Sequence, residues 1–265
     1  MCGSPLDTKE AVRLLRIVKT SGARTIVFAG GDPSLRTDIF ELVTYAQKIG
    51  LGVEIQTNAH FQPPSFLCLL ADVNLVGLSL DAHEAELHDG FRGRKGNFKQ
   101  VCGMLDFLRQ KGVPVIVRSL ITVSTHKSVP QLAVRLKEYP NLIRWSLLEF
   151  TPIGKGFENC DKYALDRALY ESSVALATSL AGEAIKVDVY RNEDKTGTYA
   201  LVTPDGQLYG TGSVINGDYP KVGSMLQTHL DELARRLTFI PENHARRYGT
   251  LPIVVGSDHQ KPETA

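Results

Sequence analysis

The sequence predicts an α/β fold in which a parallel sheet is covered by helices. Short apolar or β-branched runs alternate with amphipathic runs of helical period, and the connections between them are short. The apolar runs recur at intervals of about 20–30 residues, the spacing that a βα barrel or an open α/β sheet needs. A chain of 265 residues is long enough to bury one large core with a small appendage.

The first element is a helix over 6–22, where Asp7 caps the N-terminus, Glu10 completes a capping box and Gly22 ends the helix. Strands and helices then alternate up to residue 150. The expected strands are 25–29, 52–56, 73–80, 113–123 and 142–150, and the helices between them are 37–50, 63–71, 96–112 and 128–139.

The pattern changes after residue 156. A long helix over 160–182 is followed by a strand at 184–190, a hairpin that turns at Pro204-Asp205-Gly206, and a helix over 224–237. We therefore expect a barrel-like core over 1–156 and a C-terminal extension of helix, hairpin and helix over 157–250. The tail, 251–265, is rich in proline, glycine and charge, which predicts disorder.

The composition excludes several classes of protein. The formal net charge of +1 gives no electrostatic case for nucleic acid or an anionic membrane as partner. No apolar run approaches the ~20 residues that span a bilayer, and the N-terminus lacks the apolar region of a signal peptide, so we expect a cytoplasmic protein. None of the four cysteines forms a C-x-x-C pair. Cys68 and Cys102 have apolar neighbours and are expected in the core.

The chain opens with a helix where a βα unit would open with a strand. Without that strand, the apolar run 25–29 lies at an unprotected sheet edge, which folded proteins usually avoid. We therefore expect that an N-terminal piece is missing from this sequence or is replaced by a partner.

Polar residues follow each predicted strand. Because ligands of parallel α/β proteins bind outside the carboxyl ends of the strands, these residues are expected to converge on one mouth. They are Gly30, Gly31 and Asp32; Gln56, Thr57 and Asn58; Ser79 and Asp81; Arg118, Ser119 and Thr122; and Glu149 and Thr151. Any one of them alone is better explained as the polar start of a loop.

The stretch "TIVFAGGDP" indicates which kind of ligand group this mouth would bind. Two glycines let the backbone approach a ligand closely, and no phosphate-binding glycine motif is present. A carboxylate at Asp32 repels phosphate and attracts an ammonium group, such as the amine of an amino acid. Arg92 and Arg94 are candidates for binding the carboxylate of the same ligand, although a solvated basic turn explains them equally well.

Five segments, in this order and spacing, resemble the core of the radical S-adenosylmethionine (radical SAM) enzymes, with the likeness closest to the viperin-like and SPASM-type branches. They are "TIVFAGGDP", "EIQTNA", "VGLSLD", "HDGFRGRKGNF" and "LLEFTPIGKG". The resemblance implies a partial (βα)6 TIM-like barrel that here lacks its first strand. It also implies a site for S-adenosylmethionine, in which Gly30-Gly31-Asp32-Pro33 matches the motif that binds its amino group.

The resemblance implies further contacts to this ligand. Ser79 and Arg92 would hold the ribose or carboxylate, Asn58 and Arg118 would lie near the ligand, and the backbone from Glu149 to Pro152 would face adenine. A nucleoside triphosphate substrate is disfavoured, because the late strands carry Ile116 and Ser146 where viperin-like enzymes have lysines.

The sequence departs from the family at its defining motif. The three cysteines of C-x3-C-x2-C, which hold a [4Fe–4S] cluster, are absent, and the motif would fall just before this sequence begins. Cys2 is either its last cysteine or a bystander. We expect a truncation or a mis-assigned start, or else a member of the family that has lost its cluster. An auxiliary cluster is not expected, since Gly210-Thr211-Gly212 replaces the usual cysteines.

Three functions stay open at this stage. The first is a radical SAM enzyme that cleaves S-adenosylmethionine to a 5′-deoxyadenosyl radical, using a reductant such as flavodoxin or ferredoxin, and acts on a small molecule or peptide. The second is a cluster-less protein that binds S-adenosylmethionine or a related nucleoside as a pseudoenzyme or partner subunit. The third is an unrelated barrel with a divalent metal on Asp32, Asp81 and Glu149. No catalytic residue is identified.

Overall fold

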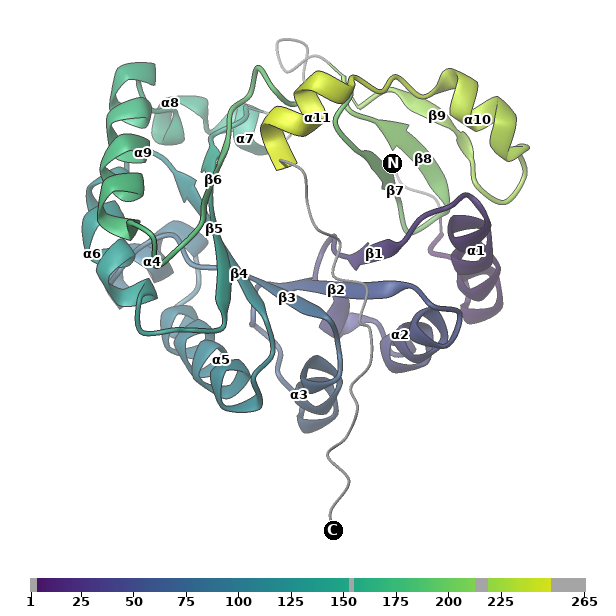
Figure 1. Ribbon diagram of the computed structural model, residues 1–265, viewed down its shortest axis with the longest axis horizontal. Coiled ribbons are helices and arrows are strands. Elements are labelled where there is room, and N and C mark those ends of the chain that lie inside the picture. Colours follow the sequence, from purple (N-terminus) through teal and green to yellow (C-terminus); the bar gives the residue numbers. More distant parts are fainter. Residues whose placement is uncertain (1–3, 153–154, 213–218, 249–265) are drawn as a thin grey trace.

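The computed structural model describes residues 4–152, 155–212 and 219–248, and its main feature is a six-stranded parallel sheet. The strands follow one another in chain order, and Figure 1 shows them curving into an open barrel with helices on the outside. They are β1 Thr25–Phe28, β2 Gly52–Thr57, β3 Leu75–Ser79, β4 Val115–Ile121, β5 Leu142–Glu149 and β6 Val187–Tyr190. The predicted partial TIM-like barrel is confirmed.

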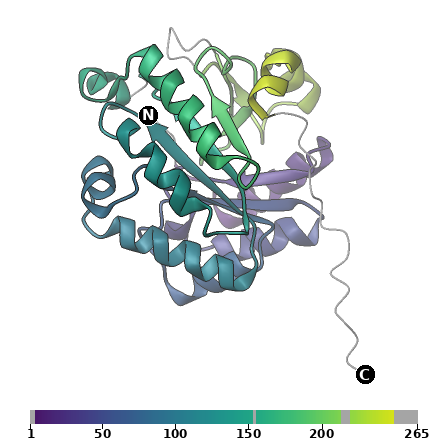
Figure 2. The same cartoon turned by 60° about the vertical axis from the view of Figure 1, so that its left-hand side comes forward.

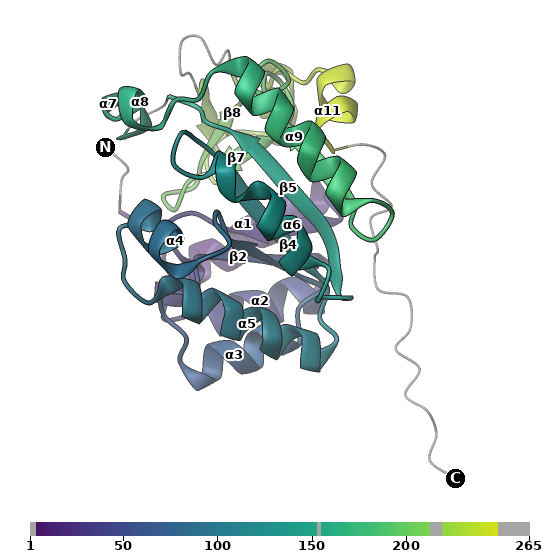
Figure 3. The same cartoon turned by 90° about the vertical axis from the view of Figure 1, so that its left-hand side faces the viewer.

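Helices alternate with these strands and cover the outer face of the sheet, as Figures 2 and 3 show from the side of α5, α6 and α9. One helix, α4, extends the connection between β3 and α5. The helices up to the end of the parallel sheet are α1 Thr8–Thr20, α2 Ile39–Lys48, α3 Pro64–Ala71, α4 Ala85–Arg92, α5 Asn97–Lys111, α6 Val129–Leu136, α7 Lys155–Glu158, α8 Cys160–Tyr163 and α9 Arg167–Ala181, with short 3-10 helices η1 Pro33–Leu35 and η2 His126–Ser128. The predicted capping box between Asp7 and Glu10 is formed at the start of α1.

A second, smaller sheet packs against α1. It is antiparallel, and Leu208, Val222 and Met225 form a hydrophobic cluster with Leu14 and Ile17 of α1. Its hairpin turns at the predicted Pro204-Asp205-Gly206, where Gly206 has a positive φ of 75°. Its elements are β7 Ala200–Val202, β8 Gln207–Gly210 and β9 Lys221–Ser224, followed by α10 Leu230–Arg236 and α11 Pro241–Tyr248.

The parallel sheet has an apolar outer face and a mixed inner face. Along β4, Val115, Val117 and Ile121 lie fully buried in the core formed with the helices. Because side chains alternate along a strand, Arg118 points to the opposite, inner face of the barrel. In register with Arg118 are Ser79 of β3 and Ser146 of β5. The inner face therefore carries polar groups that a packed barrel core does not require.

The structure differs from the sequence predictions at several places. The sheet continues past residue 156, where we expected the core to end, because β6 pairs with β5. The helix expected over 160–182 is two helices, since the side chain of Asp166 accepts hydrogen bonds from Ala168 and Leu169 and starts α9 there. Cys68 is exposed, because α3 buries its other face through Phe66, Leu69 and Leu70.

The remaining predictions concern the edge of the sheet, the two ends of the chain and membrane-spanning helices. Residues 25–28 form the expected edge strand of the sheet. The tail over 251–265 and Cys2 lie outside the described residues. Within the part that is described, no helix combines the length and the apolarity that crossing a bilayer requires.

Candidate functional site

The turn after β1 is held in place by Asp32. Gly30 has φ of 105°, a left-handed conformation that favours glycine. Asp32 caps η1, and its Oδ1 accepts hydrogen bonds from the backbone N and the hydroxyl of Ser34 at 3.0 and 2.6 Å. Pro33, the first residue of η1, is buried. The sharp turn and the cap together fix the backbone of Gly30 and Gly31 at the mouth of the barrel.

Asp32 also ties this turn to the end of β2. Its Oδ2 accepts hydrogen bonds from the hydroxyl of Thr57 at 2.8 Å and from the backbone N of Asn58 at 2.9 Å. The carboxylate thus accepts four hydrogen bonds, about as many as its two oxygens can take. Its negative charge still lies on the turn, so Asp32 both shapes the mouth and makes it attractive to a cation.

A continuous chain of hydrogen bonds leads from Asp32 to Arg92. The carbonyl of Asn58 accepts from the side chain of Asn97 at 2.9 Å, and Oδ1 of Asn97 lies 3.0 Å from Nε2 of His88. Nδ1 of His88 accepts from the backbone N of Asp81 at 3.2 Å, and Oδ2 of Asp81 accepts from Nε of Arg92 at 2.5 Å. We call these six residues, Asp32, Asn58, Asn97, His88, Asp81 and Arg92, the strand-end network.

The strand-end network changes the sequence interpretation of Arg92. We expected a loop around "HDGFRGRKGN", but Arg92 is the last residue of α4. Its Nε is bound to the fully buried Asp81, which fixes the guanidinium, and its side chain is 27% exposed. The terminal nitrogens of a guanidinium anchored through Nε form a fork that suits a ligand carboxylate.

His88 stays neutral in the folded protein. Burial lowers the pKa of His88, against the opposing effect of the nearby Asp81 carboxylate. Nδ1 of the His88 ring accepts a hydrogen bond from the backbone N of Asp81, and Nε2 donates one to Oδ1 of Asn97. A ring with one accepting and one donating nitrogen is neutral. Burial also lowers the pKa of His60, and Arg94 adds to this effect.

These lowered pKa values predict a pH-dependent stability. The unfolded chain takes up protons on His88 and His60 as the pH falls through about 6.5, whereas the folded protein resists them, so the free energy of unfolding falls below that pH. Each group contributes a slope of at most about 1.4 kcal/mol per pH unit.

Urea unfolding between pH 7.5 and 5 measures this slope. His88→Gln should flatten it, while the same change at the exposed His229 should leave it intact. A slope that survives His88→Gln unchanged would show that His88 is protonated in the folded protein.

The other predicted site residues form two separate groups. In the barrel, Nη2 of Arg118 binds Oε1 of Glu54 at 2.7 Å, and half-buried Ser79 lies in register beside Arg118. At the ends of β5 and β6, Asn192 joins Glu149 and Thr151: its backbone N donates to Glu149 at 2.7 Å, and its Oδ1 accepts from the Thr151 hydroxyl at 2.6 Å. Sequence analysis missed Asn192, His88 and Asn97, since none of them directly follows a strand of the predicted core.

The residues present fit S-adenosylmethionine better than they fit a metal. In the described ranges, no three His, Cys, Asp or Glu side chains gather as a metal site. The three carboxylates proposed as metal ligands have other partners. Asp32 accepts a hydrogen bond from Thr57, Asp81 forms an ion pair with Arg92, and Glu149 forms one with Arg167. The described cysteines, Cys68, Cys102 and Cys160, are free thiols. The described residues therefore do not supply ligands for a [4Fe–4S] cluster, whereas the turn at Asp32 and the fork of Arg92 offer an anion and a cation to an amino acid.

Comparison with known proteins shows what the chain as a whole is similar to. Residues 3–132 match the Radical SAM superfamily, in which a [4Fe–4S] cluster is typical. The chain is 32% identical over 154 residues to the AdoMet-dependent heme synthase of Oleidesulfovibrio alaskensis, covering 57% of this chain and 39% of that protein. It is 34% identical over 161 residues to the mycofactocin maturase MftC of Mycolicibacterium smegmatis, covering 59% and 40%. The chain thus spans about two fifths of the length of these curated relatives.

Solved structures share the fold. Streptococcus suis SuiB bound to S-adenosylmethionine superimposes with a TM-score of 0.67 at 16% identity, over 89% of this chain and 59% of SuiB. Native anSMEcpe with bound AdoMet gives a TM-score of 0.67 at 19% identity, over 91% of this chain and 75% of that chain. At these identities the likeness establishes the fold alone, a partial TIM-like barrel.

Proposed function

We propose that this chain, which contains a radical SAM domain, binds S-adenosylmethionine at the carboxyl ends of its parallel strands. The observation that carries the proposal is the strand-end network. It links the turn of Gly30, Gly31 and Asp32 to Arg92 through hydrogen bonds of 2.5–3.2 Å. An anion and a cation held by one rigid network match the amine and carboxylate of the methionine moiety.

In this proposal each group has a separate task. Asp32 positions the Gly30-Gly31 backbone and supplies negative charge for the amine, and Arg92 takes the carboxylate. Ser79, Asn58 and Arg118 line the barrel toward the ribose, and the backbone at Glu149 through Thr151 faces the adenine. Pro33 fixes the turn.

Titration calorimetry of the full chain with S-adenosylmethionine tests the proposal. We expect saturable binding of one ligand per chain. Adenosine, which lacks the amine and the carboxylate, should bind at least about 100-fold more weakly, because two charge-assisted contacts are lost at about 1.5–3 kcal/mol each. Equal binding of the two compounds would remove the assigned roles of Asp32 and Arg92.

Arg92→Lys is expected to weaken S-adenosylmethionine about tenfold, because one ammonium cannot hold Asp81 and also present a fork to a carboxylate. The matched control is Arg109→Lys on the outer helix α5, where the guanidinium lies over the ring of Tyr139. The control should leave the affinity unchanged. An unchanged affinity in Arg92→Lys as well would argue against a carboxylate at this position.

The reaction that we propose is that of a radical SAM enzyme acting on a small molecule or a peptide. When a [4Fe–4S] cluster is bound, it supplies the electron that splits S-adenosylmethionine. One solved structure of similar fold is that of Streptococcus suis SuiB bound to the precursor peptide SuiA, which supports a peptide as one class of substrate. The second candidate is a cluster-less binding protein, favoured by the lack of a ligand set in the described ranges.

Iron and sulfide analysis of the protein purified anaerobically from its own host separates these two candidates. About four irons per protein, with the broad visible absorbance of an iron–sulfur cluster, are expected for the radical enzyme. Saturable binding of S-adenosylmethionine without iron would instead establish the binding protein.

A further inference from the structure

The inner face of the parallel sheet carries a continuous row of polar side chains. Ser79 of β3, Arg118 of β4, Ser146 of β5 and Asp188 of β6 are in register with one another. Side chains alternate along a strand, and the apolar residues next to these four lie in the core behind the sheet, so the four face the inside of the barrel. We call them the polar row. The proposed function uses Ser79 and Arg118 and leaves Ser146 and Asp188 without a role.

The charges on this inner face cancel. The parallel strands place four charged side chains there, and these form two ion pairs: Arg118 with Glu54 at 2.7 Å, and Arg144 with Asp188 at 3.1 Å. The second pair is deeply buried, since its side chains are only 11% and 9% exposed. A ligand group with a net charge would therefore bring a charge that no residue of these strands balances.

The hydroxyl of Ser146 is unused in the protein's own hydrogen bonds. Ser146 is 1% exposed, and its Oγ has no hydrogen-bond partner among the residues that the structure describes. Its two neighbours in the polar row are turned toward other partners, Arg118 toward Glu54 and Asp188 toward Arg144. Because nearly all buried polar groups are hydrogen-bonded, an unpaired hydroxyl here indicates that a water or a ligand is its partner.

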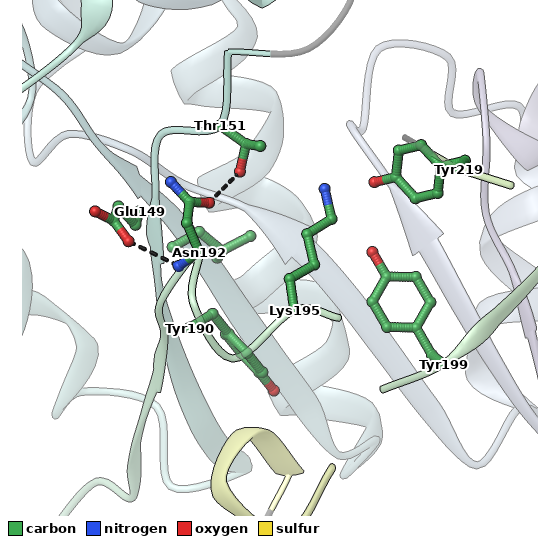
Figure 4. A pocket seen from close by; sticks show the side chains of 8 residues that line it. Glu149, Thr151, Tyr190, Asn192, Lys195, Tyr199 and Tyr219 are labelled. Atoms are coloured by element: carbon green, nitrogen blue, oxygen red, sulfur yellow. Dashed lines mark hydrogen bonds between the residues drawn. The ribbon is translucent and has the colours of Figure 1, made fainter. Parts of the chain in front are cut away.

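A pocket of about 300 Å³ adjoins this part of the polar row, at the carboxyl ends of β5 and β6. Its lining includes Leu148 and Tyr190, which are in register and follow Ser146 and Asp188 by two residues on the same face of the sheet. Figure 4 shows Tyr190 and Lys195 among the side chains of this lining. Two residues along a strand span about 6.6 Å, so a small ligand whose apolar body lies against Leu148 and Tyr190 can place its polar end at the row.

We propose that the polar row binds an uncharged carboxamide of the substrate between Ser146 and Asp188. The hydroxyl of Ser146 donates to the carbonyl oxygen of the carboxamide. The carboxylate of Asp188 accepts from its N–H, because a carboxylate takes about four hydrogen bonds and Arg144 supplies one of them. A carboxamide offers both groups on adjacent atoms and adds no charge.

Charged ends suit the row less well. A carboxylate would meet the negative charge of Asp188, and an ammonium or amidinium would meet Arg144, which already balances Asp188. The inference that the carboxamide belongs to the substrate rests on the proposed function, because it depends on S-adenosylmethionine binding in the other half of the barrel.

Benzamide, benzoate and benzamidine are the probes, because they share one ring and carry a neutral, a negative and a positive end. Ligand-observed NMR titration of the full chain is the measurement. Benzamide should bind with a dissociation constant of about 1 mM, as expected for so small a ligand, and each charged probe at least about tenfold more weakly. A charged probe that binds as tightly as benzamide would overturn the proposal. So would the absence of saturable benzamide binding, which would leave the Ser146 hydroxyl to water.

Ser146→Ala should weaken benzamide about 3- to 10-fold, yet the midpoint of urea unfolding should not fall, since the hydroxyl bonds no described residue. The control is Ser119→Ala, a buried serine of the neighbouring strand whose side chain lies on the outer face. Its hydroxyl donates to the carbonyl of Leu80 and accepts from Nε1 of Trp145. The control should unfold at lower urea and bind benzamide as the unchanged protein does. Undiminished benzamide binding in Ser146→Ala would refute the proposal.

Asp188→Asn tests the balance of charge. The substitution keeps the shape of the side chain and leaves Arg144 without its counter-charge. Benzoate should then bind about tenfold more tightly than it does to the unchanged protein, and the preference for benzamide should disappear. An unaltered order of the three probes in folded Asp188→Asn would show that this ion pair does not set the selectivity, and the proposal would fall.

Titration of the same sample with S-adenosylmethionine keeps the two proposals apart. If S-adenosylmethionine binds and benzamide does not, only the carboxamide site fails. If benzamide binds in a Ser146-dependent manner and S-adenosylmethionine does not, the carboxamide site stands and the proposed function fails.

Discussion

Asp32→Ala is expected to abolish measurable binding of S-adenosylmethionine and to lower the free energy of unfolding by about 2–4 kcal/mol. The loss of binding follows from two effects, since the negative charge disappears and the Gly30-Gly31 turn loses its attachment to β2. The loss of stability follows because Ser34, Thr57 and the backbone N of Asn58 lose a charged acceptor. Calorimetric titration and urea unfolding of the same preparation measure the two effects.

Asp38→Ala is the matched control for this substitution. Asp38 is a carboxylate six residues further along, at the start of α2, and it accepts hydrogen bonds from Thr8 at 2.7 Å and Arg36 at 2.9 Å. Its removal should also lower the free energy of unfolding, but the affinity for S-adenosylmethionine should not change. If Asp32→Ala is folded and binds as tightly as Asp38→Ala, the central assignment of the site is wrong.

An intermediate variant distinguishes the two roles of Asp32. Asp32→Asn keeps one oxygen acceptor and removes the charge, so part of the attachment to Ser34 or to Thr57 survives. A variant that is nearly as stable as the original protein but binds S-adenosylmethionine much more weakly would assign the binding to charge. Parallel loss of stability and affinity would assign it to the position of the turn.

Local patterns in the sequence were sufficient to predict most of the barrel. Strand runs such as 113–123 are apolar on both faces over most of their length, and the capping box of Asp7 and Glu10 marks the start of α1 within one turn. The turn of Gly30 to Pro33 was located for the same reason, because its chemistry lies in four consecutive residues. Features that depend on neighbours along the chain are the ones that sequence patterns describe.

Contacts between distant segments could not be predicted in this way. His88 and Asn97 join Asp81 to Asn58 only because α4 and α5 fold back over the ends of β2 and β3. Lys195 and Glu149 line the same pocket although they are more than forty residues apart in the chain. The hydrogen bond from the Asn192 backbone to Glu149 joins residues that are similarly far apart. No local period encodes such pairs, so a lone histidine or lysine in the sequence carried no signal of its place.

The bond between Arg118 and Glu54 depends on a glycine that the sequence analysis did not single out. Arg118 on β4 reaches Glu54 on β2 by crossing β3 at Gly77, since Nη1 of Arg118 lies 2.0 Å from where a Cβ of residue 77 would stand. Gly77 has no positive φ, so its backbone does not require glycine. The space above it is what the guanidinium needs, and any side chain at this position would occupy the path of the arginine.

Gly77→Ala is therefore expected to displace the Arg118 guanidinium from Glu54. The cost should be about 1–3 kcal/mol in the free energy of unfolding, because Glu54, whose side chain is only 11% exposed, loses its charged partner and keeps only the hydrogen bond from Gln56. The arginine is flexible at its far end, so the fold should survive. The inner face of the barrel would change at the place where we propose that Arg118 lies near S-adenosylmethionine, and the affinity should fall about tenfold.

Two comparisons make this prediction specific. Gly103→Ala, in the middle of α5 with no atom within 4 Å of the added Cβ, should raise the free energy of unfolding by about 0.5–1 kcal/mol. In the background of Arg118→Ala, the cost of Gly77→Ala should fall markedly, because both Arg118 atoms near the added Cβ are gone and only Cγ of Gln56, at 3.1 Å, stays close to it. If Gly77→Ala lowers the free energy of unfolding equally with and without Arg118, residue 77 is glycine for a reason other than the crossing arginine. The ion pair between β2 and β4 would then not explain the glycine.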